Sequence, residues 1–227
     1  MCFGETWTLV SLTALSATSV ASIAARLDWR ITAALLFVAT KELIQYLLYR
    51  SLVDTTSAAV CTPSNRALTT LSWVHVSFQP LVVNLFVQAF SATPTEYAVP
   101  LIMCVVFAVA NLLRLFLSSA SSSVRQCRET ALCGKKTCSV LGEKHVAYRF
   151  KLASADAYAW VPSWFAYMLL TFVPAFAIGD YSIATIHAIV FLASFAYFQD
   201  EGEAAAVWCV NSFWFVGFAC ARMLGYM

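Results

Sequence analysis

The 227-residue chain has little charge, because Asp, Glu, Lys and Arg make up only 11% of it whereas soluble domains have about a quarter. Glycine and proline are also scarce, with 7 and 6 residues, and the Walker, Rossmann and Gly-x-Ser-x-Gly motifs are absent. Hydrophobic residues instead form 61% of the chain. This excess excludes a soluble enzyme, a disordered protein and a fibrous coiled coil, and it predicts a protein surrounded by a lipid bilayer.

The apolar residues fall into runs long enough for transmembrane helices, which need about 20 residues each. The predicted spans are residues 7–25, 31–49, 68–90, 98–117, 158–178, 182–199 and 204–224. We therefore expect an all-α fold, a polytopic membrane bundle of seven transmembrane helices. It forms a single domain over residues 1–227, with a basic, cysteine-containing loop at about 118–157.

Basic residues predict the orientation of this bundle. Half of the 14 Lys and Arg residues lie between positions 125 and 151, namely Arg125, Arg128, Lys135, Lys136, Lys144, Arg149 and Lys151. Loops rich in Lys and Arg stay on the inner side of a membrane, so we expect the N-terminus inside and the C-terminus outside. The same segment is expected to contact anionic lipid headgroups, and the net charge of +2 does not suggest a nucleic-acid partner.

Five of the eight cysteines map to the predicted inner side: Cys2, Cys61, Cys127, Cys133 and Cys138. Such cysteines form disulfides if that side is oxidising, and bind a metal or exchange thiols if it is reducing. Cys133 and Cys138, separated by four residues, form the candidate disulfide or thiol pair.

Polar side chains inside the predicted spans are the main functional candidates, because each is costly in hydrocarbon and normally faces the bundle interior. Glu42 and Gln45 share one helix face, as do His75 and Gln79, since residues three or four apart are neighbours on a helix. We expect a polar pocket in the inner half of the bundle, centred on Glu42 and His75. Its other expected members are Gln45, Gln79, Asn84, Arg114 and Asn211.

The chain has only three histidines, His75, His145 and His187. A catalytic zinc site needs three protein ligands and one open position, so these side chains are the candidate ligands of zinc or another transition metal. Glu42 is then the candidate catalytic acid or base. The alternative is three separate histidines that are satisfied by local hydrogen bonds.

Several short motifs also resemble a family of uncharacterised multi-pass membrane proteins. They are the opening Met1-Cys2-Phe3, Glu42-x-x-Gln45, His75-x-x-x-Gln79-Pro80, Cys133-Gly134 with Cys138-Ser139, Gly142-x-x-His145-Val-Ala-Tyr148 and Glu203-Ala-Ala-Ala-Val-Trp208. The resemblance runs from residue 1 to about 210 and implies a seven-helix bundle without an established activity. Tyr148 departs from the pattern, which usually has Trp at this position.

Three functions remain open from the sequence. The first is an intramembrane metal-dependent hydrolase of the zinc type, acting on a lipid-like substrate that enters from the inner leaflet. The second is a conduit or sensor for protons or a small solute, with Glu42, His75 and Gln79 along the path. The third is a non-catalytic membrane subunit of a larger complex, whose aromatic side chains pack against protein partners or lipid.

Overall fold

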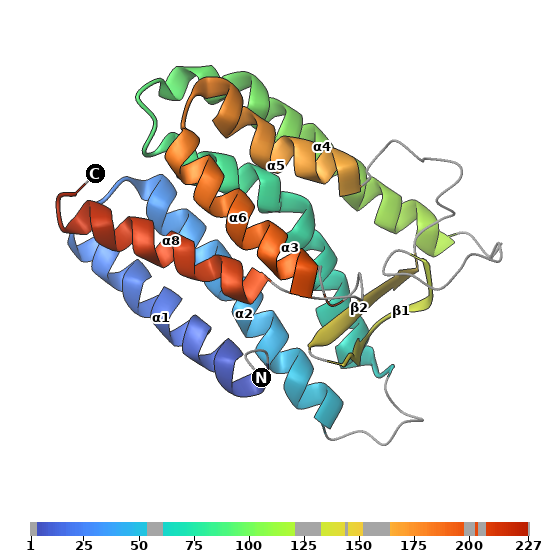
Figure 1. Ribbon diagram of the computed structural model, residues 1–227. Coiled ribbons are helices and arrows are strands. Elements are labelled where there is room, and N and C mark those ends of the chain that lie inside the picture. Colours follow the sequence, from blue (N-terminus) through green and yellow to red (C-terminus); the bar gives the residue numbers. More distant parts are fainter. Residues whose placement is uncertain are drawn as a thin grey trace.

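Seven α-helices and one β-hairpin make up the described part of the chain in a computed structural model. The structure describes residues 4–53, 61–120, 133–143, 145–151, 164–197, 203 and 208–226. The helices lie alongside one another and alternate in direction, and the hairpin lies at one end of the bundle (Figure 1). We call this the hairpin end and the other the turn end.

The helices match the predicted apolar runs. They are α1 (Glu5–Ala24), α2 (Trp29–Val53), α3 (Pro63–Gln88), α4 (Ala98–Ala120), α5 (Trp164–Ile178), α6 (Tyr181–Tyr197) and α8 (Trp208–Met223), with a short 3₁₀ helix η1 (Pro94–Tyr97) before α4. Four stretches are long and apolar enough to cross a membrane: residues 5–24, 29–52, 63–88 and 94–115. Three apolar helices are shorter, at residues 165–178, 181–194 and 213–223. The mainly helical fold is thus confirmed, with four helices that fit a membrane span by length and composition.

The basic, cysteine-containing segment at about 118–157, expected as a loop, contains two strands among its described residues. That segment contains β1 (Cys133–Leu141) and β2 (Val146–Lys151), which pair antiparallel, with Ser139 opposite Tyr148 and Leu141 opposite Val146. The turn is closed by the backbone N–H of Gly142, which donates to the carbonyl of His145 at 2.8 Å. Apolar residues at every second position from 146 to 150 give this segment the period of a strand with one buried face.

Helix α3 occupies a central position, since it contacts α2, α4, α5 and both strands. Its start is set by local chemistry: the Thr62 side chain accepts a hydrogen bond from the backbone N–H of Asn65 at 3.2 Å, and Pro63 fills the first helical position. Pro80 lies inside the helix and has no N–H to donate to the carbonyl of Val76. Because neighbours surround α3, its polar side chains are buried rather than solvated.

Two clusters of buried apolar residues hold the structure together. The larger one runs between the helices and includes Leu35, Phe86, Tyr167 and Phe215. The smaller one lies between the hairpin and the helices, where Val146, Tyr148 and Phe150 of β2 pack with residues of α2, α3 and α4, namely Ile44, Leu48, Tyr49, Leu52, Trp73 and Leu115. The hairpin is therefore seated on the bundle by its own apolar face.

Candidate functional site

Charged side chains near the middle of α2 are buried inside the bundle. The side chains of Lys41 and Glu42 are 5% and 0% exposed, and Lys41 Nζ lies 3.3 Å from Glu42 Oε1. The second carboxylate oxygen, Oε2, is buried without a hydrogen-bond partner among the described residues. An ion pair removed from water in this way is costly to form, so its presence indicates a specific role.

His75 of α3 offers a second buried acceptor. Its Nε2 lies 2.7 Å from the carbonyl oxygen of Phe37, and the two rings stack with centroids 3.7 Å apart. A carbonyl oxygen can only accept, so Nε2 carries the proton and Nδ1 holds the lone pair of a neutral imidazole. Nδ1 is buried and has no hydrogen-bond partner among the described residues.

A small cavity lies beside Lys41 and His75. It measures about 10 Å³, which is room for one water molecule. Lys41, His75 and Gln79 line it, together with Phe37, Val38, Val82, Val83 and Phe215. Lys41 therefore reaches Glu42 on one side and the His75 cavity on the other. We call Lys41, Glu42, Gln45, His75 and Gln79 the polar centre.

Buried polar side chains also form a row along α3. Asn65, Thr69, Ser72, His75 and Gln79 follow one another at intervals of three or four residues, and all five are buried. This spacing places them on one face of the helix. At the far end of the row, the hydroxyl of Tyr167 donates to Gln79 Oε1 at 2.9 Å. The row thus connects the hairpin end of α3 with the polar centre.

Hairpin side chains cover the polar centre from the end of the bundle. Gln45 Nε2 donates to the hydroxyl oxygen of Tyr148 at 3.2 Å, and both residues are fully buried. His145 lies beside Tyr49, with ring centroids 5.5 Å apart. Burial, followed by the positive charge of Lys41, lowers the pKa of His145 to about 3. The imidazole is therefore neutral at physiological pH.

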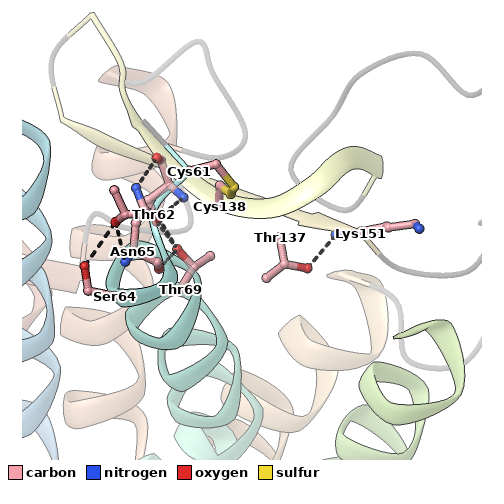
Figure 2. The surroundings of a disulfide bond; sticks show 9 residues. Cys61, Thr62, Ser64, Asn65, Thr69, Thr137, Cys138 and Lys151 are labelled. Carbon is pink, nitrogen blue, oxygen red and sulfur yellow. Dashed lines mark hydrogen bonds between the residues drawn. A yellow bond between two sulfur atoms is a disulfide. The ribbon is translucent and has the colours of Figure 1, made fainter. Parts of the chain in front are cut away.

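Two fastenings connect the hairpin to the start of α3 (Figure 2). A disulfide joins Cys61 to Cys138, with Cα atoms 5.6 Å apart. Asn65 pairs with the backbone of Ser139: Nδ2 donates to the carbonyl at 2.9 Å, and Oδ1 accepts from the N–H at 2.8 Å. The hydroxyls of Thr69 and Ser139 lie 2.7 Å apart.

The candidate pairing of Cys133 with Cys138 is therefore wrong. The two cysteines lie on the same strand and are separated by an irregularity in the register, whereas Cys138 faces the start of α3, where Cys61 lies. Cys2 and Cys127 lie outside the described residues.

The other predicted pocket residues do not all meet at the centre. Asn84 donates to the carbonyls of Pro80 and Leu170, at 2.7 and 2.8 Å, and so joins α3 to α5. Arg114 is half-buried on α4. Asn211 belongs to α8, but its side chain lies outside the described residues. Of the expected pocket, Glu42, Gln45, His75 and Gln79 are placed on the facing helices α2 and α3.

The three histidines do not form a metal site. His187 lies between Phe172 and Trp214, with centroid distances of 4.6 and 4.8 Å, while His75 packs against Phe37 and His145 against Tyr49. In the described ranges no group of three or more His, Cys, Asp or Glu side chains could hold a metal ion. The expectation of a three-histidine metal centre is thus wrong, because each imidazole is held in its own aromatic surroundings.

Sequence reasoning missed several members of the site. Lys41 was visible as a charge next to Glu42, but adjacent residues on a helix point in different directions, so a contact was not expected. Tyr148 was noted only as a departure from a motif, although it is the partner of Gln45. Asn65 and Thr69 carried one available signal, the four-residue spacing that continues toward His75.

Comparison with known proteins gives a family but no activity. The model of a family of unknown function, DUF5765, matches residues 6–225, so the chain belongs to this family. The resemblance to an uncharacterised family is confirmed to that extent. No curated protein and no solved structure matches the chain.

Proposed function

We propose that the protein is a seven-helix integral membrane protein that conducts protons, with the polar centre as the proton-binding step of the path. Support for the membrane comes from the four helices that are long and apolar enough to cross it and from the three shorter apolar helices packed beside them. An ionisable pair inside such a bundle is a functional site by default, because its burial costs stability.

The observation that carries the proposal is the pair of buried acceptor atoms without partners, Glu42 Oε2 and His75 Nδ1. Each can take a proton without breaking an existing hydrogen bond. Lys41 connects them, since it contacts Glu42 and lines the cavity beside His75. One water in this cavity would give a proton a carrier between the cavity wall and His75.

The size of the cavity favours protons over larger solutes. About 10 Å³ admits one water and no organic substrate. The polar row on α3 supplies hydroxyl and amide groups leading from the hairpin end to His75. A hydrolase, by contrast, requires a pocket for its substrate and, in the zinc class, three ligands.

The test is proton flux in liposomes that contain the purified protein and a trapped pH-sensitive dye, driven by a potassium diffusion potential. Glu42→Gln removes a protonatable group while keeping the shape of the side chain, and we expect the flux to fall at least about tenfold, the effect of about 1.4 kcal/mol on a barrier. His75→Gln is expected to do the same, because Gln can still donate to the Phe37 carbonyl but cannot relay a proton.

Glu96→Gln is the matched control, since Glu96 is an exposed carboxylate in η1. Its flux should equal that of the wild type. Each variant must also elute as a folded species in mild detergent, so that lost flux is not lost protein. Wild-type flux no higher than that of empty liposomes, or flux unchanged in both Glu42→Gln and His75→Gln, would contradict the proposal.

A further inference from the structure

The hairpin covers the polar centre with the apolar face of β2. Tyr148 is the covering residue: its hydroxyl meets Gln45, which lies one helical turn from Glu42. Val146 and Phe150 flank it on the same face of β2 and are buried in the cluster under the hairpin. Without the hairpin, Gln45 would lose its hydrogen bond to the Tyr148 hydroxyl.

The hairpin is held to α3 by hydrogen bonds and by a disulfide, and only the disulfide can be cleaved by a chemical reaction. The hydrogen bonds of Asn65 and Thr69 to Ser139 form again whenever the groups meet. The Cys61–Cys138 disulfide, next to Ser139 in sequence, joins positions 77 residues apart and breaks only by reduction. The structure thus places a reducible bond at the point where the cover is attached.

We infer that the β1–β2 hairpin is a lid over the polar centre, held shut by the Cys61–Cys138 disulfide and released when that bond is reduced. The lid would regulate access of water and protons to the polar centre, and in this respect the inference rests on the proposed function. Since disulfides persist in oxidising compartments, the hairpin end faces such a compartment.

The exposure of the two sulfurs indicates how release proceeds. Cys61 is half-buried, whereas Cys138 is 6% exposed. A thiolate of a dithiol reductant therefore attacks Sγ of Cys61, the S–S bond breaks, and Cys138 leaves as a thiolate. The second thiol of the reductant then displaces Cys61 and closes a cyclic disulfide. Two electrons and two protons pass from the reductant to the cysteine pair.

This orientation differs from the one that the basic residues predict. Glu5, at the start of α1, lies 3.4 Å from Arg50 near the end of α2, so the start of α1 is also at the hairpin end. The disulfide places this end outside or in a lumen, whereas the Lys and Arg residues of 125–151 predict that it is inside. In sealed vesicles of known orientation, a membrane-impermeant phosphine followed by an impermeant maleimide should label Cys61 only from the oxidising side.

The lid itself is tested by hydroxyl-radical footprinting of the purified protein in mild detergent, with and without dithiothreitol. Tyr148 is 1% exposed in the closed lid, and we expect its oxidation to rise at least about tenfold on reduction, since a disulfide commonly changes an opening equilibrium by a factor of roughly 30 or more. Tyr97, buried at the turn end, is the internal control and should not change.

Two substitutions sharpen the test. Cys61→Ser should show high Tyr148 oxidation with or without reductant, while Cys220→Ser, which removes a free thiol, should respond to reductant like the wild type. Tyr148 oxidation that is equal in oxidised and reduced protein would overturn the lid, as would a parallel rise at Tyr97, which marks global unfolding. Maleimide labelling of Cys61 from the reducing side alone would also overturn it.

Flux measured on the same samples separates this inference from the proposed function. Higher proton flux on reduction, together with higher Tyr148 oxidation, supports both. If Tyr148 becomes accessible on reduction and no sample conducts protons, the result supports the lid and contradicts the proposed proton conduction. If the protein conducts protons equally in both redox states while Tyr148 stays protected, the result supports proton conduction and contradicts the lid.

Discussion

The two ends of the bundle are closed by different means. At the turn end the connections are short: α1 and α2 are joined by a few residues that include Asp28, and α5 and α6 by Gly179 and Asp180, with Gly179 at φ +98°. At the hairpin end the fastenings join residues 70 or more positions apart. The connections at the turn end are therefore short, whereas the hairpin is attached to α3 by bonds between segments far apart in the sequence.

The ion pairs of the two helical regions differ in burial. The turn end has an Asp28–Arg30 ion pair two residues apart and a hydrogen bond from the Tyr97 hydroxyl to Asp180 at 2.7 Å. Midway along α2 lies a buried ion pair, Lys41–Glu42, with side chains 5% and 0% exposed. The buried ion pair costs stability, and the hairpin above it is attached by a reducible bond.

The largest expected effect is on the buried ion pair. Lys41→Met should lower the free energy of unfolding by roughly 3–5 kcal/mol, because it leaves Glu42 charged and buried without its cation. Arg30→Met at the turn end makes the same chemical change in a pair whose side chains are 20% and 30% exposed, so its cost should stay below about 1 kcal/mol. Unfolding by SDS in mixed micelles gives both values.

The double variant Lys41→Met with Glu42→Leu checks the cause. With both charges gone, stability should return to within about 1 kcal/mol of the wild type, because a buried pair replaced by apolar side chains is often neutral. Proton flux should remain abolished. Equal losses of stability in Lys41→Met and Arg30→Met would remove the distinction between the two ends.

The next largest effect is on the disulfide. Cys138→Ser should lower the free energy of unfolding by about 2–4 kcal/mol under oxidising conditions, since the bond constrains a loop of 77 residues. Under reducing conditions the variant and the wild type should be equally stable. Cys220→Ser, near the turn end of α8, should change stability by less than about 0.5 kcal/mol. A redox-independent difference between Cys138→Ser and wild type would point to packing rather than the bond.

These differences also explain what the sequence predicts well. The helices follow from apolar runs of about 20 residues, and Glu42 with Gln45, or His75 with Gln79, follow from helical spacing within one element. That α2 and α3 face each other is a reasonable expectation for consecutive helices. Four residues of the polar centre could therefore be predicted from local sequence patterns.

Contacts between residues far apart in the sequence could not be predicted from local patterns. Five cysteines on one side allow many pairings, and nothing in their spacing selects Cys61 with Cys138. Tyr148 meets Gln45 across 103 positions, and the strand that carries it was hidden in a segment whose basic residues suggested a solvated loop. The three histidines lie on α3, α6 and the hairpin, so only packing decides that each is surrounded by different aromatic rings.

A smaller effect is expected for the hydrogen-bonded fastening. Asn65→Ala should cost about 1–3 kcal/mol, because it leaves the buried backbone N–H and carbonyl of Ser139 without their side-chain partner. Gln88→Ala at the turn end removes one bond, from Nε2 to the carbonyl of Pro94 at 2.7 Å, at a partly buried site, and should cost less. Tyr148 oxidation should rise in Asn65→Ala and stay unchanged in Gln88→Ala. The reverse order would show that Asn65 does not hold the hairpin.

The smallest expected effect is a difference between the two ends in how the free energy of unfolding depends on pH. His145 has a pKa of about 3 in the folded chain because of burial and the charge of Lys41, against 6.5 when unfolded. Stability is therefore complete above pH 6.5 and falls as the pH drops toward 3, since the unfolded chain binds a proton that the folded chain does not. The loss should reach about 1.4 kcal/mol at pH 5.5. At the turn end, the hydrogen bond from Arg30 lowers the pKa of Asp28 below 3.8, so its contribution is lost only at lower pH.

His145→Gln isolates this effect, because Gln is similar in size and does not titrate. The free energy of unfolding is measured at pH 7.5 and 5.5 for wild type and variant, and the wild type should lose about 1.4 kcal/mol more than the variant. Asp28→Asn, the matched change at the turn end, should lose as much as the wild type over this interval, because its titration lies below it. Identical losses in wild type and His145→Gln would mean that His145 is hydrated and protonated in the folded chain, and that the hairpin does not seal the end of the bundle.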